Sequence, residues 1–163
     1  MISRSHVGGF WGGVVAVIVC HALNHFFHDR RRKRVKHITI PNMPHLPQFS
    51  HATVCGDIVH ISGCIGLEGD TMQVVEGGIE AETTAALHCV RRILENCGRG
   101  ARLLKVNVYI KGNSKERFME MNNAYSRFFE EVGWEYCARI TVGCGALALG
   151  AQVEIDAVAT TGV

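Results

Sequence analysis

From residue 37 onward, apolar positions alternate in some stretches and recur at helical spacing in others. Alternation predicts strands, which we place at 37–40, 52–64 (with a turn at Gly56-Asp57), 103–110, 139–142 and 151–158. The helical spacing predicts two helices, one over 79–97 that ends at Gly98 and one from a Ser114 N-cap to about Gly133. The order β-β-β-α-β-α-β-β predicts an α+β domain, a single sheet with two helices on one face.

Alternation within a strand also predicts which side chains share a face of the sheet. In the strand at 103–110, we expect Leu104, Val106 and Val108 to share one face. In the last strand, Val153, Ile155 and Ala157 share one face, so Glu154, Asp156 and Val158 point to the other.

The first part of the chain has a different pattern, because no charged residue occurs from Ser5 to His28. A helix over residues 7–27 is long enough to cross a bilayer of roughly 30 Å. The basic run at 30–34 that follows predicts that the rest of the chain faces the cytosol. We therefore expect a membrane-anchored protein with a cytosolic body. The alternatives are a mitochondrial targeting segment, a soluble cytoplasmic protein, or a basic nucleic-acid-binding patch.

Charged residues are also distributed unevenly between the first part of the chain and the rest. The 163 residues have a net charge of +2. Residues 1–40 hold seven basic residues and one acidic residue, whereas residues 41–163 hold ten basic and fourteen acidic residues. A body with a net charge of −4 is a poor surface for phosphate groups, so we expect no nucleic-acid partner. The sequence therefore predicts an N-terminal segment, 1–36, and a folded domain, 37–163.

Seven cysteines are scattered along the chain without a CxxC pair or the Cys/His spacing of a metal site. This usage favours free thiols in a reducing compartment and indicates no metal site.

Two charged residues lie in apolar strands and are the candidate chemistry. Arg139 precedes Ile140-Thr141-Val142, and Glu154 lies between Val153 and Ile155. From spacing alone, an ordinary ion pair on an exposed strand face remains the alternative to a functional site.

Five motifs in register from about residue 37 to 160 resemble the RidA (YjgF/L-PSP) family. They are Pro47-Gln48-Phe49-Ser50-His51-Ala52, Ile61-Ser62-Gly63-Cys64, Met121-Asn122-Asn123-Ala124-Tyr125 with Phe128-Phe129, Ala138-Arg139-Ile140-Thr141-Val142, and Leu147-Ala148-Leu149-Gly150 followed by Val153-Glu154-Ile155-Asp156-Ala157-Val158-Ala159.

The resemblance implies a chorismate-mutase-like subunit that forms a homotrimer, with sites in the clefts between subunits. It also implies hydrolytic deamination of reactive 2-imino acids (2-iminobutanoate, 2-iminopropanoate) to 2-oxo acids and ammonia. No metal or organic cofactor is expected.

The physical chemistry of this reaction suits the residues of the motifs. A guanidinium can bind a substrate carboxylate with two parallel hydrogen bonds, which is the role expected for Arg139. Backbone N–H groups near Gly63 and Thr141 can add donors. Glu154 is expected to orient a water molecule and to move protons.

Four further residues are expected at the substrate-binding site: Phe49 as a wall, Ser62 and Cys64 as lining, and Asn122 as a hydrogen-bonding brace. Three positions depart from the family pattern, since Phe49, Cys64 and Ala148 replace tyrosine, glutamine and proline. A thiol nucleophile at Cys64 is less favoured than a small buried side chain, because no histidine is identified beside it. The alternative functions are a carboxylate-binding interaction module and, less favoured, an endoribonuclease.

Overall fold

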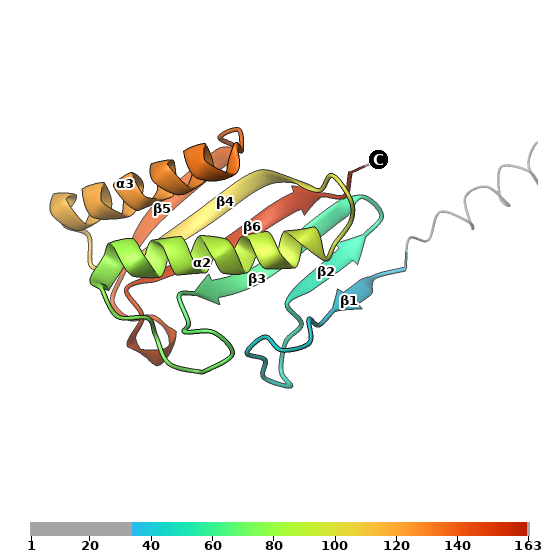
Figure 1. Ribbon diagram of the computed structural model, residues 1–163, viewed down its shortest axis with the longest axis horizontal. Helices are drawn as coiled ribbons and strands as arrows, with labels where there is room; N and C mark the ends of the chain where they lie inside the picture. The colour runs from blue at the N-terminus through green and yellow to red at the C-terminus, as the bar shows by residue number, and fades with distance from the viewer. Residues whose placement is uncertain (1–33, 163) are drawn as a thin grey trace, which may run out of the picture. The chain divides into compact units, whose positions relative to one another are not determined.

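The computed structural model describes residues 34–162, which form a six-stranded sheet in the order β1-β2-β3-β6-β4-β5 (Figure 1). The strands are β1 (Lys36–Ile38), β2 (Ala52–Cys55), β3 (Ile58–Ile65), β4 (Arg102–Lys111), β5 (Ala138–Cys144) and β6 (Val153–Thr160). All neighbouring strands are antiparallel except β4 and β5, which are parallel. β6 lies between β3 and β4 and is the strand on which the sheet is centred.

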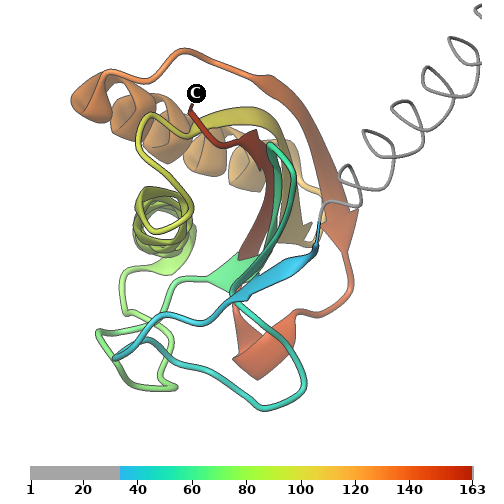
Figure 2. The same ribbon diagram turned by 90° about the vertical axis from the view of Figure 1, so that its right-hand side faces the viewer.

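Helices α2 (Gly78–Glu95) and α3 (Lys115–Val132) lie on the same face of the curved sheet (Figure 2). Each helix buries one apolar stripe, as the helical spacing predicted. For α2 the stripe includes Ala86, Leu87, Val90 and Ile93, and for α3 it includes Met121, Tyr125, Phe128 and Phe129. The core lies between these stripes and the buried residues of β3, β4 and β6. The predicted α+β fold is therefore confirmed.

The helix ends follow the expected local chemistry, with one difference. The Ser114 hydroxyl accepts a hydrogen bond from the N–H of Arg117, and Gly133 ends α3 in the left-handed region. α2 ends at Glu95, with Asn96 as its C-cap, rather than continuing to Cys97. The predicted helix over 79–97 was therefore two residues too long at this end.

The prediction for β4 was wrong at Leu104. A register shift between Leu103 and Lys105, where β4 pairs with β6, interrupts the alternation. Leu104 is 45% exposed, whereas Val106 and Val108 are fully buried. An irregularity of this kind moves the residues before it to the other face of the sheet, and apolar alternation alone does not reveal it.

The structure gives no support to the predicted membrane anchor. No helix within residues 34–162 is both long and apolar enough to cross a membrane. The predicted anchor, residues 7–27, lies outside the described residues, as does the basic run up to Lys33. The predicted location, a membrane anchor with a cytosolic body, is therefore withdrawn.

A buried carboxylate connects the helices to the start of β6. Glu82 on α2 is 3% exposed, and its Oε2 accepts a hydrogen bond of 2.6 Å from the backbone N–H of Gln152. Its Oε1 accepts from Nε2 of Gln152 at 3.0 Å, while Arg117 on α3 donates to Oε1 of Gln152 at 2.8 Å. This network fixes the backbone two residues before Glu154, so it sets where the candidate catalytic carboxyl lies.

We predict that Glu82→Ala lowers the free energy of unfolding by about 3 kcal/mol, because the Gln152 N–H loses a charged partner in a buried place. Glu80→Ala is the control on the same helix. Glu80 pairs with Arg127 on the surface at 2.6 Å, and such a pair contributes at most about 1 kcal/mol. Urea denaturation measures both, and equal losses for the two variants would contradict the role of Glu82.

Candidate functional site

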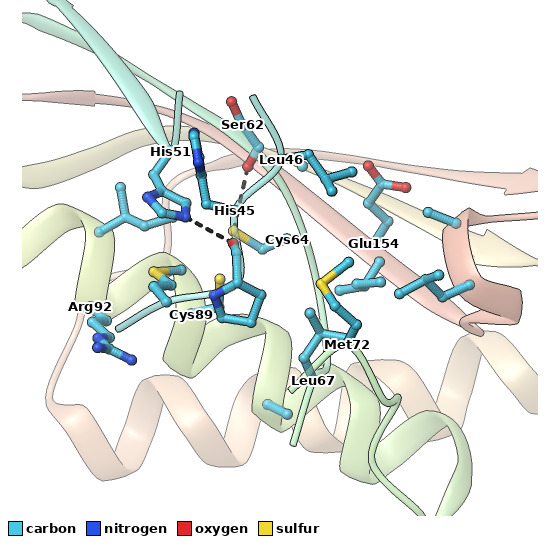
Figure 3. Close-up of a pocket in the computed structure, with 18 of the residues that line it drawn as sticks. His45, Leu46, His51, Ser62, Cys64, Leu67, Met72, Cys89, Arg92 and Glu154 are labelled. Atoms are coloured by element: carbon cyan, nitrogen blue, oxygen red, sulfur yellow. Dashed lines mark hydrogen bonds between the residues drawn. The ribbon is translucent and has the colours of Figure 1, made fainter. Parts of the chain in front are cut away.

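A cavity of about 600 Å³ lies beside β3 (Figure 3). β2 pairs with β3 only as far as Ala52 and Ile61, so the chain before β2 leaves the sheet there. The cavity is enclosed by this loop (43–51), the end of β3, the chain at 67–72, α2, and the short helix η1 (Ala148–Gly150). Of the predicted site residues, five line it: Phe49, Ser62, Gly63, Cys64 and Glu154.

Gly63 is the position that admits Glu154 to this cavity. Glu154 comes from the next strand, β6, and its carboxyl lies directly over Gly63. A Cβ at Gly63 would overlap the Glu154 carboxylate, with Cδ only 3.0 Å away. The pairing of β3 with β6 also shifts register between Ile61 and Cys64, so the regular alternation of side chains along β3 is interrupted around Gly63. Glycine is therefore required here by a close approach between two strands.

The electrostatic surroundings of Glu154 favour its neutral form. Burial raises the pKa of the Glu154 carboxyl, and the nearby Asp156 carboxylate raises it further. A carboxyl with a raised pKa takes up and releases protons closer to neutral pH than an exposed one does.

Ser62 and Cys64 are not activated as nucleophiles. The Ser62 hydroxyl donates to the Ser50 carbonyl at 2.7 Å, and the Ser62 N–H donates to the His51 carbonyl at 3.0 Å. A hydrogen bond with Cys89 and burial raise the pKa of the Cys64 thiol well above its ordinary value. The thiol form is therefore favoured, whereas a nucleophilic cysteine needs the opposite shift.

The loop at 41–51 is held in place by His51, whose role the sequence did not reveal. Its Nδ1 accepts a hydrogen bond of 2.9 Å from the Ile40 N–H. Because Nδ1 is the acceptor, Nε2 carries the proton and donates to the Pro44 carbonyl at 3.0 Å. His51 is 3% exposed, and Phe49 on the same loop is 42% exposed at the cavity.

Arg92 is a second residue that the sequence reasoning missed. It lies on α2, lines the cavity, and its Nη2 donates to the carbonyls of Pro41 and Asn42 at 3.2 and 2.6 Å. Its partners lie about fifty positions away in the chain, so no local pattern predicts this contact.

Arg139 does not line the cavity formed by its own chain. It pairs with Val106 on β4, whereas Glu154 pairs with Tyr109, three positions further along. Paired residues share a face, and faces alternate along a strand, so Arg139 and Glu154 lie on opposite faces of the sheet. The Arg139 guanidinium lies 4.7 Å from the centre of the Tyr125 ring, on the face that the helices cover.

Thr141 and Asn122 also lie away from the cavity lining. Thr141 follows Arg139 on β5, and its buried hydroxyl has no hydrogen-bond partner within the described part of the chain. Asn122 is half-buried on α3, one turn before Tyr125. The eight predicted residues therefore form two groups in one chain, with Glu154 in one and Arg139 in the other.

Within residues 34–162, no group of three or more histidine, cysteine or acidic side chains is arranged to hold a metal ion. No disulfide bond joins any two of the six cysteines in that range. That the reaction needs no metal or organic cofactor stays a prediction.

We predict that His51→Leu lowers the free energy of unfolding by about 2–4 kcal/mol. The substitution leaves the Ile40 N–H and the Pro44 carbonyl without partners, and each buried orphan contributes about 1–3 kcal/mol. His51→Gln is the matched control, because an amide can both accept and donate and should retain most of the stability. Urea denaturation of the two variants tests this, and a fully stable His51→Leu protein would refute it.

The comparisons with known proteins agree with this architecture. The family model described as Endoribonuclease L-PSP matches residues 41–161. A RutC family protein of Aquifex aeolicus is 36% identical over 68% of this chain and 86% of its own length. The human protein named 2-iminobutanoate/2-iminopropanoate deaminase is 30% identical over 70% of this chain and 80% of its own length. The crystal structure of the E. coli YjgF gene product is similar with a TM-score of 0.69 and 26% identity, over 77% of this chain and 98% of that one. The chain therefore belongs to the Endoribonuclease L-PSP family, the RidA (YjgF/L-PSP) family that its motifs resemble.

Proposed function

We propose that this protein hydrolyses reactive 2-imino acids to 2-oxo acids and ammonia. The observation that carries the proposal is the Glu154 carboxyl, which lies over Gly63 at a largely apolar cavity and has a raised pKa. Relatives at about 30% identity that are named 2-iminobutanoate/2-iminopropanoate deaminase support the same reaction.

The reaction needs one water molecule and three proton transfers. Water adds to the carbon of the protonated imine while a base accepts a proton from it, which forms a neutral carbinolamine. The nitrogen then takes up that proton, the carbon–nitrogen bond breaks, and the carbinol hydroxyl gives up its own proton as the carbon–oxygen double bond of the 2-oxo acid forms, so ammonia leaves and is released as ammonium. Glu154 can serve both steps, accepting the proton from water and returning it to the leaving nitrogen.

Arg139 is proposed to bind the substrate carboxylate through its planar guanidinium. Because Arg139 and Glu154 lie on opposite faces of one sheet, we propose that a site combines Glu154 of one subunit with Arg139 of the partner subunit. Thr141 and Asn122 would then join the site together with Arg139.

Association of copies of the chain, as in the expected trimer, is supported by the sheet face that neither α2 nor α3 covers. Ile140 and Val142 on the edge strand β5 point to this face, at 50% and 41% exposure. Large exposed apolar residues that lie close together on one face are typical of a protein–protein interface. Burying this face between copies of the chain would bring the edge strand β5 of one subunit against another.

We predict that the purified protein accelerates 2-oxo acid release from imines generated in situ by an amino-acid oxidase. Glu154→Gln should lower kcat about 10²–10⁴-fold, the usual range for a lost general acid–base group. Arg139→Lys should mainly raise KM, because an ammonium cannot form the paired hydrogen bonds. Arg127→Ala is the control, since Arg127 lies exposed on α3 and pairs with Glu80. Equal rates for wild type and Arg139→Ala, both at the uncatalysed level, would overturn the proposal.

The pH dependence tests the role of Glu154 separately. The carboxylate needed to accept a proton forms only above the raised pKa of Glu154. We therefore expect kcat to fall on acidification at a pH above the ordinary glutamate range, and this limb should be absent from the residual rate of Glu154→Gln. An acid limb at the ordinary glutamate pKa would contradict the assignment.

A further inference from the structure

Most of the cavity wall is apolar, although Glu154 lies at one end of it. Away from Glu154, its walls are mainly aliphatic and sulfur-bearing side chains, among them Met43, Leu67, Met72, Cys89 and Ile93. Figure 3 shows Glu154 and Arg92 at opposite ends of the cavity, with Cys64, Cys89 and Met72 between them. The carboxyl that would meet the reacting carbon therefore lies at one end of an apolar space.

Several polar side chains that line the cavity are bound to protein atoms, and His88, which also lines it, packs edge-on against Phe128 with ring centroids 4.9 Å apart. Arg92 donates to two backbone carbonyls and lies 3.7 Å from the Asp70 carboxylate. Both ring nitrogens of His51 have backbone partners, and the Cys64 thiol donates to the Ser62 carbonyl at 3.4 Å. A ligand group placed among these side chains would find apolar contacts rather than a free charge.

The volume of the cavity exceeds what a small imino acid needs. At about 600 Å³, it lies in the middle of the range of roughly 300–1,000 Å³ for pockets that take drug-sized ligands. 2-Iminopropanoate has a single methyl side chain, which would leave most of the apolar wall in contact with water. Each further buried methylene should raise kcat/KM about fourfold.

We infer that the site prefers 2-imino acids with long or aromatic apolar side chains, such as those derived from leucine, norleucine, methionine and phenylalanine. The imine carbon lies at Glu154 and the side chain extends along the cavity toward Cys89 and Met72. This inference rests on the proposed function, because it concerns the substrate of the same site.

The test compares kcat/KM for imines generated from alanine, 2-aminobutanoate, norvaline, norleucine, leucine, methionine, phenylalanine and glutamate. The uncatalysed rate of each imine is subtracted. From 2-aminobutanoate to norleucine the chain gains two methylenes, so we expect a rise of about sixteenfold. The imine from glutamate should be poor, because its second carboxylate would enter an apolar space.

A variant with a larger side chain in the cavity wall tests whether the cavity causes this preference for long side chains. Cys89→Leu adds bulk to the interior and should lower the norleucine-to-alanine ratio of kcat/KM at least tenfold. Glu95→Leu makes the same kind of change on an exposed part of α2 outside the cavity, and the ratio should not change. If Cys89→Leu does not fold, Ala85→Val narrows the same cavity with a smaller side chain and should lower the ratio in the same direction.

The possible results distinguish the inferred substrate preference from the proposed hydrolysis of imines. Turnover of the short imines at rates equal to or above those of the long ones would overturn the inference and leave the proposed function intact. The fastest turnover with the glutamate-derived imine would likewise overturn it. No acceleration with any imine would overturn both.

Discussion

The alternation of side chains along β6 is the constraint on which the rest of this structure depends. Val153, Ile155 and Ala157 are at most 1% exposed beneath the two helices, which forces Glu154 and Asp156 to the opposite face. The same alternation on β5, counted through its register with β4, turns Arg139 toward the helices. A single chain therefore separates the guanidinium and the carboxyl that its motifs suggest act together. The proposed function consequently requires an assembly, and the apolar sheet face around Ile140 offers the surface for it.

Gly63 allows the Glu154 carboxyl to reach the cavity from this face of the sheet. Glu154 can lie at the cavity only because β3 has no side chain where the carboxyl crosses it. That contact with protein removes water from the carboxyl, and with Asp156 nearby it raises the pKa of Glu154. The neighbouring Ser62 and Cys64 are kept unreactive by a hydrogen bond to Ser50 and by burial beside Cys89. The resulting site suits proton transfer to and from water better than covalent catalysis.

The sequence predicted those parts of the fold that local chemistry determines. Ser114 and Gly133 mark the ends of α3 because a cap and a left-handed residue act within one helical turn. The bulge at Leu104 could not be predicted, since it depends on how β4 pairs with β6 rather than on the order of apolar residues. The contacts of His51, Arg92 and Glu82 were also missed, because each joins segments that are distant in sequence. The motif resemblance identified Gly63 and Glu154 separately, and only the structure shows that one must be small for the other to reach the cavity.

The central claim is that each site takes Glu154 from one subunit and Arg139 from the partner subunit. The most direct measurement mixes two inactive variants, Arg139→Ala and Glu154→Gln, unfolds them together and allows them to reassemble. If the two groups come from different subunits, random assembly of a symmetric oligomer restores about a quarter of the sites, and imine hydrolysis returns to about that share of the wild-type rate. If the two groups act within one chain, no intact site can form, and the mixture stays as inactive as its components.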